Sequence, residues 1–170
     1  MVVVDKWDTV PLHSEDISPQ SFVDVWWLVD DGGLTIMLPW LIQRNWPCPM
    51  RIFAIPASIS TVARETRLVE KMIREFRIDG DVVVVTPDEV EVSNDEVHEF
   101  CAKNHISSDY EARSHRYLVL SKLFSLYSRD SVAVFCSLPF PRPDIDSNVW
   151  MAWLQLLNDS VDKAMVFVRG

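Results

Sequence analysis

The chain has 170 residues, of which 48% are hydrophobic, and a formal net charge of −9 at pH 7. A chain of this size can bury most of its surface in one core, and its acidic balance excludes nucleic acid and anionic membrane surfaces as partners, because both require a basic face. Its three cysteines cannot all pair, which is typical of free thiols in a reducing compartment such as the cytosol.

The predicted elements begin after an irregular stretch. Residues 1–22 contain Pro11 and Pro19 and little regular period, so we expect a lead-in followed by one α/β domain over residues 23–170. Five short, nearly continuous apolar runs predict strands buried on both faces of a mostly parallel sheet; they span residues 23–29, 50–55, 81–86, 131–137 and 164–168. The four consecutive valines at 82–85 predict a central strand.

Segments with helical period lie between these runs. Their alternation with strands predicts right-handed crossover connections and helices on both faces of the sheet. Ser93 with Glu96, and Ser108 with Glu111, match the capping box that marks a helix start. The most apolar uncharged stretch, residues 32–43, is interrupted by Pro39 and is shorter than the ~20 residues of a membrane span.

The first candidate site is the turn Asp30, Asp31, Gly32 and Gly33, which leaves the first predicted strand and opens a helix. Doubly wound folds bind ligands at this edge of the sheet. However, the G-x-G-x-x-G spacing is incomplete, and two carboxylates would repel a pyrophosphate. We therefore interpret the four residues as a structural turn, with Asp31 as a helix cap and the glycines allowing the reversal.

A second candidate is a metal site at His98, Cys101 and His105, whose spacing of three and four places them on one face of a helix. A structural zinc site normally needs four ligands, and no fourth ligand appears at a characteristic spacing. A partly buried helix face with incidental histidines is the better interpretation. We predict no metal site and no cofactor.

A third candidate is nucleophilic chemistry at Cys136 or Ser137, near the end of the fourth predicted strand. No G-x-S-x-G elbow surrounds either residue, and no recognisable arrangement supplies a base from the four histidines His13, His98, His105 and His115. A core cysteine and a strand-end serine are therefore favoured, and we predict that the chain is not an enzyme.

The segment at residues 148–157, NVWMAWLQLL, is apolar nearly all round. A helix of this kind must bury more than one face, so it is either an interface helix or a fully buried core helix, and both readings stay open. Trp150 and Trp153 lie on one side of it and form the candidate interface, because tryptophan is enriched among residues that dominate interface energy.

The run VDVWWLVDDGGLTIMLPWLI at residues 23–42 closely resembles a segment in the cytosolic carboxy-terminal domain of cation-chloride cotransporters. The resemblance continues in order through MRIFAI, REFRIDGDVVVV, SHRYLVLSKLF, SVAVFCSLPFPRP, MAWLQLL and VFVRG. It implies the second half of that domain, with a fold similar to universal stress proteins. DDGGLT, FRID and MAWL look more like the sodium-potassium-chloride branch than the potassium-chloride branch.

The resemblance implies a cytosolic regulatory and assembly domain of an electroneutral cotransporter. Its implied partners are a second copy in a homodimer, the membrane domain of the same transporter, and regulatory kinases. The ion-binding residues of the family lie in its membrane helices, so none transfers to this chain. The family normally continues into a terminal strand after the position of Gly170, and we expect a fragment of a larger membrane protein. The alternative is a free-standing nucleotide-binding protein of the universal stress type.

Overall fold

The computed structural model describes residues 1–170 except residues 12, 19, 30–31, 57–61 and 140–142, and leaves the side chains of residues 14 and 62–65 undescribed. The chain divides into two compact units, which are described separately. The sheet unit comprises residues 1–86, 130–139 and 163–170, and the helical unit comprises residues 87–129 and 140–162. The prediction of one domain over residues 23–170 stays a prediction.

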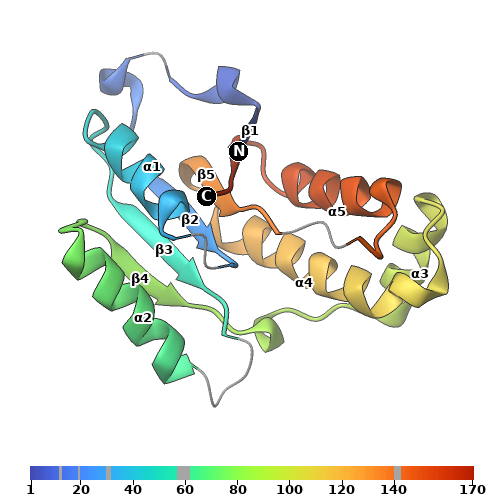
Figure 1. Ribbon diagram of the computed structural model, residues 1–170. Helices are drawn as coiled ribbons and strands as arrows, with labels where there is room; N and C mark the ends of the chain where they lie inside the picture. Colours follow the sequence, from blue (N-terminus) through green and yellow to red (C-terminus); the bar gives the residue numbers. More distant parts are fainter. Residues whose placement is uncertain (12, 19, 30–31, 57–61, 140–142) are drawn as a thin grey trace. The chain divides into compact units, whose positions relative to one another are not determined.

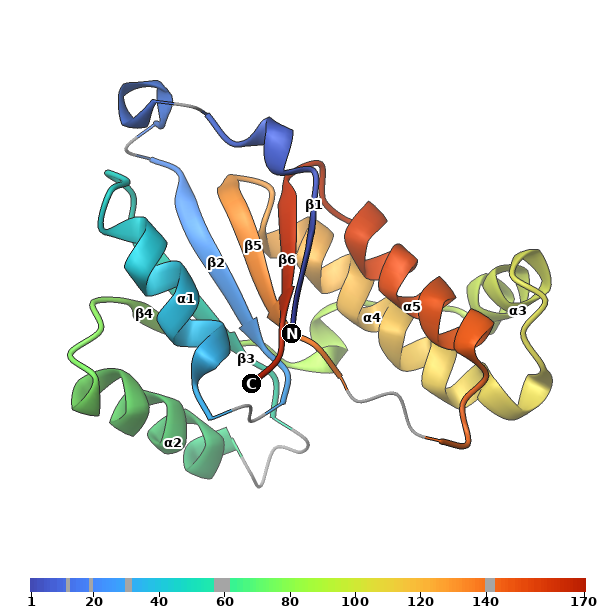
Figure 2. The same cartoon turned by 45° about the horizontal axis from the view of Figure 1, so that its top comes forward.

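The described part of the sheet unit contains six strands in one sheet, in the order β1-β6-β5-β2-β3-β4 (Figures 1 and 2). The strands are β1 (Val2–Asp5), β2 (Phe22–Trp27), β3 (Met50–Ala54), β4 (Asp81–Val84), β5 (Ser131–Ser137) and β6 (Ala164–Val168). All neighbouring pairs are parallel except β1 with β6, which is antiparallel. The α/β class is confirmed, but the sheet is mixed and six-stranded where we predicted five strands. The likeness to universal stress proteins stays a prediction.

The sixth strand, β1, comes from the predicted irregular lead-in. It is followed by two short 3-10 helices, η1 (Trp7–Thr9) and η2 (Ser14–Asp16). Figure 2 shows β1 lying along β6 at one edge of the sheet. Its residues are all exposed, so the burial pattern that predicted the other five strands is missing here.

The prediction that the valine run at 82–85 is central was wrong. β4 pairs with β3 and forms the other edge of the described sheet. The chain steps outward from β2 to β3 to β4, and the next strand, β5, returns to the opposite side of β2. Val82, Val83 and Val84 are only partly buried, whereas Val85, just beyond the strand, is fully buried and donates its N–H to Ala54.

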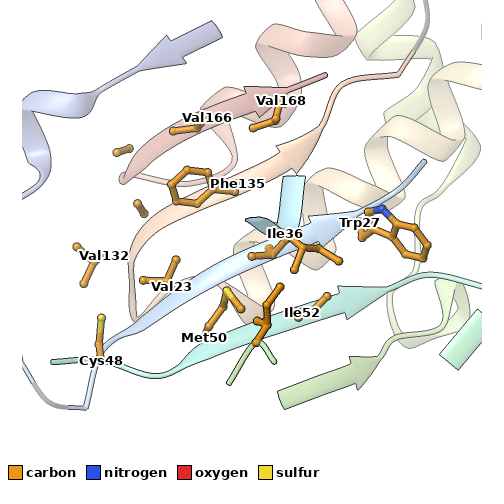
Figure 3. Packing of buried hydrophobic residues seen from close by; sticks show 14 of the residues in the cluster. Val23, Trp27, Ile36, Cys48, Met50, Ile52, Val132, Phe135, Val166 and Val168 are labelled. Carbon is orange, nitrogen blue, oxygen red and sulfur yellow. The ribbon is translucent and has the colours of Figure 1, made fainter. Parts of the chain in front are cut away.

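Helices α1 (Leu34–Gln43) and α2 (Val62–Glu75) cover one face of the sheet. Alternation along β2 sends Val23, Val25 and Trp27 to this face, where they join a core that includes Ile36 of α1 and Val69 of α2. Figure 3 shows part of this core, with labelled side chains of β2, β3, β5 and β6 on the same face of the sheet as Ile36 of α1. This packing holds together the part of the sheet where β2 and β5 lie side by side.

The helical unit contains α3 (Asn94–Lys103), α4 (Glu111–Tyr127) and α5 (Ser147–Asp159), with 3-10 turns η3 (Pro87–Glu89) and η4 (Ser108–Tyr110). Ser93 and Glu96 form the predicted capping box at the start of α3. The second predicted box is wrong: Ser107, not Ser108, accepts the capping hydrogen bond, and it caps η4. Figure 1 shows α4 and α5 side by side.

Candidate functional site

The carboxyl edge of β2 and β5 is where a ligand site is expected in this topology. The connection after β2 leads through α1 to β3 on one side, whereas the strand reached after β5 is β6 on the other side. β2 and β5 therefore flank a topological switch point, where the outgoing chains diverge and leave a crevice in many open α/β sheets.

Ser137 occupies the end of this switch point. It is fully buried, and its Oγ accepts hydrogen bonds from the backbone N–H groups of Leu28, at 2.7 Å, and Val29, at 2.9 Å. The side chain thus continues the hydrogen bonding of the parallel ladder past the last paired residues of β2. Its oxygen serves the backbone, which supports the prediction of a structural serine rather than a nucleophile.

The predicted turn at residues 30–33 lies between β2 and α1 in the chain. Gly32 and Gly33 both have positive φ angles, of 73° and 89°, a conformation that glycine adopts without steric cost. Gly33 is the N-cap of α1, and a Cβ added to it would come within 3.0 Å of Met72 Sδ. Asp30 and Asp31 lie outside the described residues, so the proposed capping role of Asp31 stays a prediction.

The three residues of the metal candidate have different surroundings. Cys101 is buried in the core of the helical unit, and His98 is exposed with its Nε2 3.6 Å from Glu111 Oε2. The helix ends at Lys103, so His105 lies outside it and has a φ of 55°. In no place in the described part of the chain do three His, Cys, Asp or Glu side chains come together to hold a metal ion.

Cys136 is fully buried in β5, and burial raises the pKa of its thiol far above the ordinary value. A thiol that stays protonated at neutral pH is a poor nucleophile. Burial also raises the pKa of Cys48. Both cysteines behave as small apolar core residues, as predicted for Cys136 from its position in an apolar strand.

The two tryptophans of the candidate interface differ in their surroundings. Trp153 is 1% exposed, stacks on Tyr117 with ring centroids 4.7 Å apart, and donates its indole N–H to Ser114 Oγ at 3.0 Å. Trp150 is only partly buried. Its indole nitrogen is shielded from solvent but has no hydrogen-bond partner among the described residues. Met151, next to it, is 55% exposed.

A buried ion pair that was not predicted from the sequence lies on neighbouring strands. Asp24 of β2 is fully buried, and both of its carboxylate oxygens accept hydrogen bonds from Arg51 of β3, each at 2.8 Å. The guanidinium also lies over the ring of Phe22, 3.8 Å from its centroid. A signal was available, because Asp24 and Arg51 each interrupt an apolar strand run.

A second feature without a sequence prediction is an apolar groove of about 320 Å³ in the sheet unit. Its lining is entirely hydrophobic and comes from β1, η1, α1, β5 and β6: Val2, Val4, Trp7, Leu38, Ile42, Phe135 and Val166. The groove carries no polar group that would orient a substrate, so it has the chemistry of a contact surface rather than of a catalytic site.

Across the described residues of the chain, no helix is both long and apolar enough to cross a membrane. The model of solute carrier family 12 matches residues 14–104 and 89–170. These two segments together include nearly all of the chain.

Three curated relatives illustrate the similarity. The chain is 34% identical to the bumetanide-sensitive sodium-(potassium)-chloride cotransporter of Manduca sexta, over 87% of this chain and 16% of that protein. It is 28% identical to solute carrier family 12 member 2 of Danio rerio, over 97% of this chain and 18% of that protein. It is 26% identical to member 3 of Homo sapiens, over 87% of this chain and 18% of that protein.

The chain thus spans less than a fifth of the length of these relatives. The family match covers the motifs at residues 23–42 and beyond that indicate a resemblance to a known family. That resemblance to the cation-chloride cotransporters is confirmed. The chain belongs to solute carrier family 12.

Proposed function

We propose that this chain is a cytosolic regulatory and assembly domain of an electroneutral sodium-potassium-chloride cotransporter, located on the cytosolic side of the membrane as part of an integral membrane protein. The observation that carries the proposal is the family match, which extends over nearly the whole chain. The first of the relatives above is itself named a sodium-(potassium)-chloride cotransporter.

The state of the candidate groups supports a role without catalysis. Ser137 is engaged by two backbone N–H groups, and Cys136 is buried with a raised pKa. The groove beside β1 is apolar throughout. These features suit a domain that makes contacts with other parts of a protein.

Transport by a hybrid protein tests this function. The matching segment of the Manduca sexta cotransporter would be replaced by this chain, and bumetanide-sensitive, chloride-dependent uptake would be measured in cells. We expect uptake to be retained, whereas a matched hybrid with Arg51→Met, which weakens the fold, should lose surface expression. Equal uptake after deletion of the whole segment would contradict a regulatory and assembly role.

We also propose that the domain forms a homodimer, with the Trp150 side of α5 as one candidate contact. The partly buried ring of Trp150 and the exposed Met151 beside it support this, because they place apolar surface on this side of α5. Trp153 is a poor probe, because it is part of the core of the helical unit. If this side of α5 is the contact, Trp150→Glu should weaken self-association while the fold persists. Trp153→Glu should unfold the helical unit. Circular dichroism and light scattering distinguish these results.

The partners proposed besides a second copy are the membrane domain of the same transporter and regulatory kinases. A free-standing nucleotide-binding protein is the rival function. Titration of the purified chain with ATP distinguishes the cotransporter domain from this rival, since saturable thermal stabilisation would favour the rival. We expect no shift in melting temperature.

A further inference from the structure

We infer that the outer edge of β1 pairs with β1 of a second copy, which would join the two sheets in one continuous sheet. This deepens the self-association proposed above and assigns it to a different surface from α5. The starting observation is that Val2, Val3 and Val4 are 48%, 47% and 49% exposed. Soluble proteins normally protect an edge strand with charges, proline, a bulge or a cover, because a bare edge is a template for another strand.

The hydrogen bonds to β6 determine which backbone groups face outward. The Met1 nitrogen donates to the Arg169 carbonyl at 2.6 Å, and the Arg169 N–H donates to the Met1 carbonyl at 2.8 Å. This is a hydrogen-bonded pair, and such pairs alternate along an antiparallel ladder. With Val3 opposite Phe167, the groups of Val3 point towards β6. The N–H and C=O groups of Val2 and Val4 therefore point away from the sheet.

This alternation restricts the register of a symmetric pair. Across a two-fold axis, residues whose backbone groups point outward must pair with residues of the same kind. The register with the greatest overlap of the valines places Val2 opposite Val4 of the second copy. Val3 then lies opposite Val3 of the second copy, on the axis. Asp5 lies beside Met1 rather than beside another carboxylate, so the pairing avoids a repulsion between like charges.

Charge favours a second copy at this surface. Each copy carries a net charge of −9, so two copies repel unless they meet where charges are few. Residues 2–4 are uncharged, and the adjacent helix α1 has no charged residue along its length. The apolar groove between them continues the same surface. Two copies meeting here would bury valine against valine.

The other edge of the described sheet offers the rival arrangement. If β1 of one copy paired with β4 of another, each copy would keep one free edge, and the assembly would grow without closing. A β1 pair closes at two copies. The size of the assembly therefore distinguishes the two arrangements.

Substitution of the residue on the axis tests the inference. Val3→Glu and Val3→Lys each place like charges opposite one another, and each should raise the dissociation constant of the dimer by roughly tenfold or more. An equimolar mixture of the two variants should recover dimers, because a glutamate then faces a lysine. Sedimentation of the 170-residue chain and of the variants measures this. Melting temperatures near that of the wild type would show that the fold persists, as expected for a residue this exposed.

Met151→Glu, on the exposed side of α5, is the matched control. We expect it to leave the dimer intact. Dimers that persist in Val3→Glu but dissociate in Met151→Glu would overturn the inference and leave the homodimer proposal standing on α5. A wild type that stays monomeric at its highest soluble concentration would overturn both, and open-ended assemblies would show pairing of β1 with β4.

Discussion

The Asp24–Arg51 pair of the sheet unit and the Glu96–Lys122 pair of the helical unit are built from similar groups in opposite surroundings. The Asp24 side chain is fully buried, and Arg51 bonds both of its oxygens at 2.8 Å. Glu96 and Lys122 are closer, at 2.6 Å, but their side chains are 42% and 37% exposed. The distance between the charged groups therefore does not decide which ion pair contributes more to stability. Water competes with the Glu96–Lys122 pair, whereas breaking the Asp24–Arg51 pair would leave a buried carboxylate without its ion pair to Arg51.

The largest effect should follow from Arg51→Met, which keeps an apolar stem but leaves Asp24 without its ion pair. We expect the free energy of unfolding to fall by about 3–5 kcal/mol, a large share of the usual 5–15 kcal/mol. Urea denaturation measures it. Lys71→Met, which removes the exposed Lys71–Glu75 pair, is the control and should change little. Equal midpoints for the two variants would show that burial does not set the difference.

Ser137→Ala should have an intermediate effect on stability. It removes a buried hydroxyl, and its effect can be compared with those of removing the buried and the exposed ion pair. The N–H groups of Leu28 and Val29, which are only partly buried, would lose their acceptor, and we expect a loss of about 1–3 kcal/mol for the two together. Ser137→Thr keeps the oxygen on a residue that suits a strand and should recover much of the loss. Thermal unfolding measures both variants. If alanine and threonine behave alike, the two hydrogen bonds do not stabilise the switch point.

The smallest effect should come from Lys122→Met and should depend on pH. The hydrogen bond from Lys122, with that from the Ser93 backbone, lowers the pKa of Glu96 from 4.5 to about 2. Because the folded pKa is depressed, the stabilisation is present above pH 4.5 and is lost as pH falls towards 2. The wild type and the variant should therefore converge in melting temperature over that range. A difference that is independent of pH would assign the effect of Lys122 to its other contact, the carbonyl of Glu91.

Five of the six described strands could be predicted from the sequence because burial on both faces leaves continuous apolar runs. The limits of β5 and β6 agree with the predicted runs at 131–137 and 164–168. The same pattern does not distinguish a central strand from an edge strand, which is why the position of β4 was wrong. β1 could not be predicted in this way, since its valines are exposed and its pairing depends on β6.

The candidate site could be predicted only in part. Glycine at positions 32 and 33 predicts a turn, because few other residues adopt positive φ readily. The switch point beside it depends on strand order, which local sequence does not specify. The partnership of Asp24 with Arg51 likewise requires β2 to lie beside β3. For α5, composition gave no means of telling Trp153, which is buried in its own unit, from Met151, which is exposed.

The pairing of β1 with β6 also bears on the order in which the sheet assembles. The bond between the Met1 nitrogen and the Arg169 carbonyl joins residues 168 positions apart. Contacts of such high sequence separation pay the largest loop-closure entropy and form late in folding, after the parallel ladders of β2, β3 and β5. β1 should therefore be the last strand to join the sheet and the first to leave it. At concentrations where the chain is monomeric, its amide protons should exchange with solvent deuterium faster than those of any other strand.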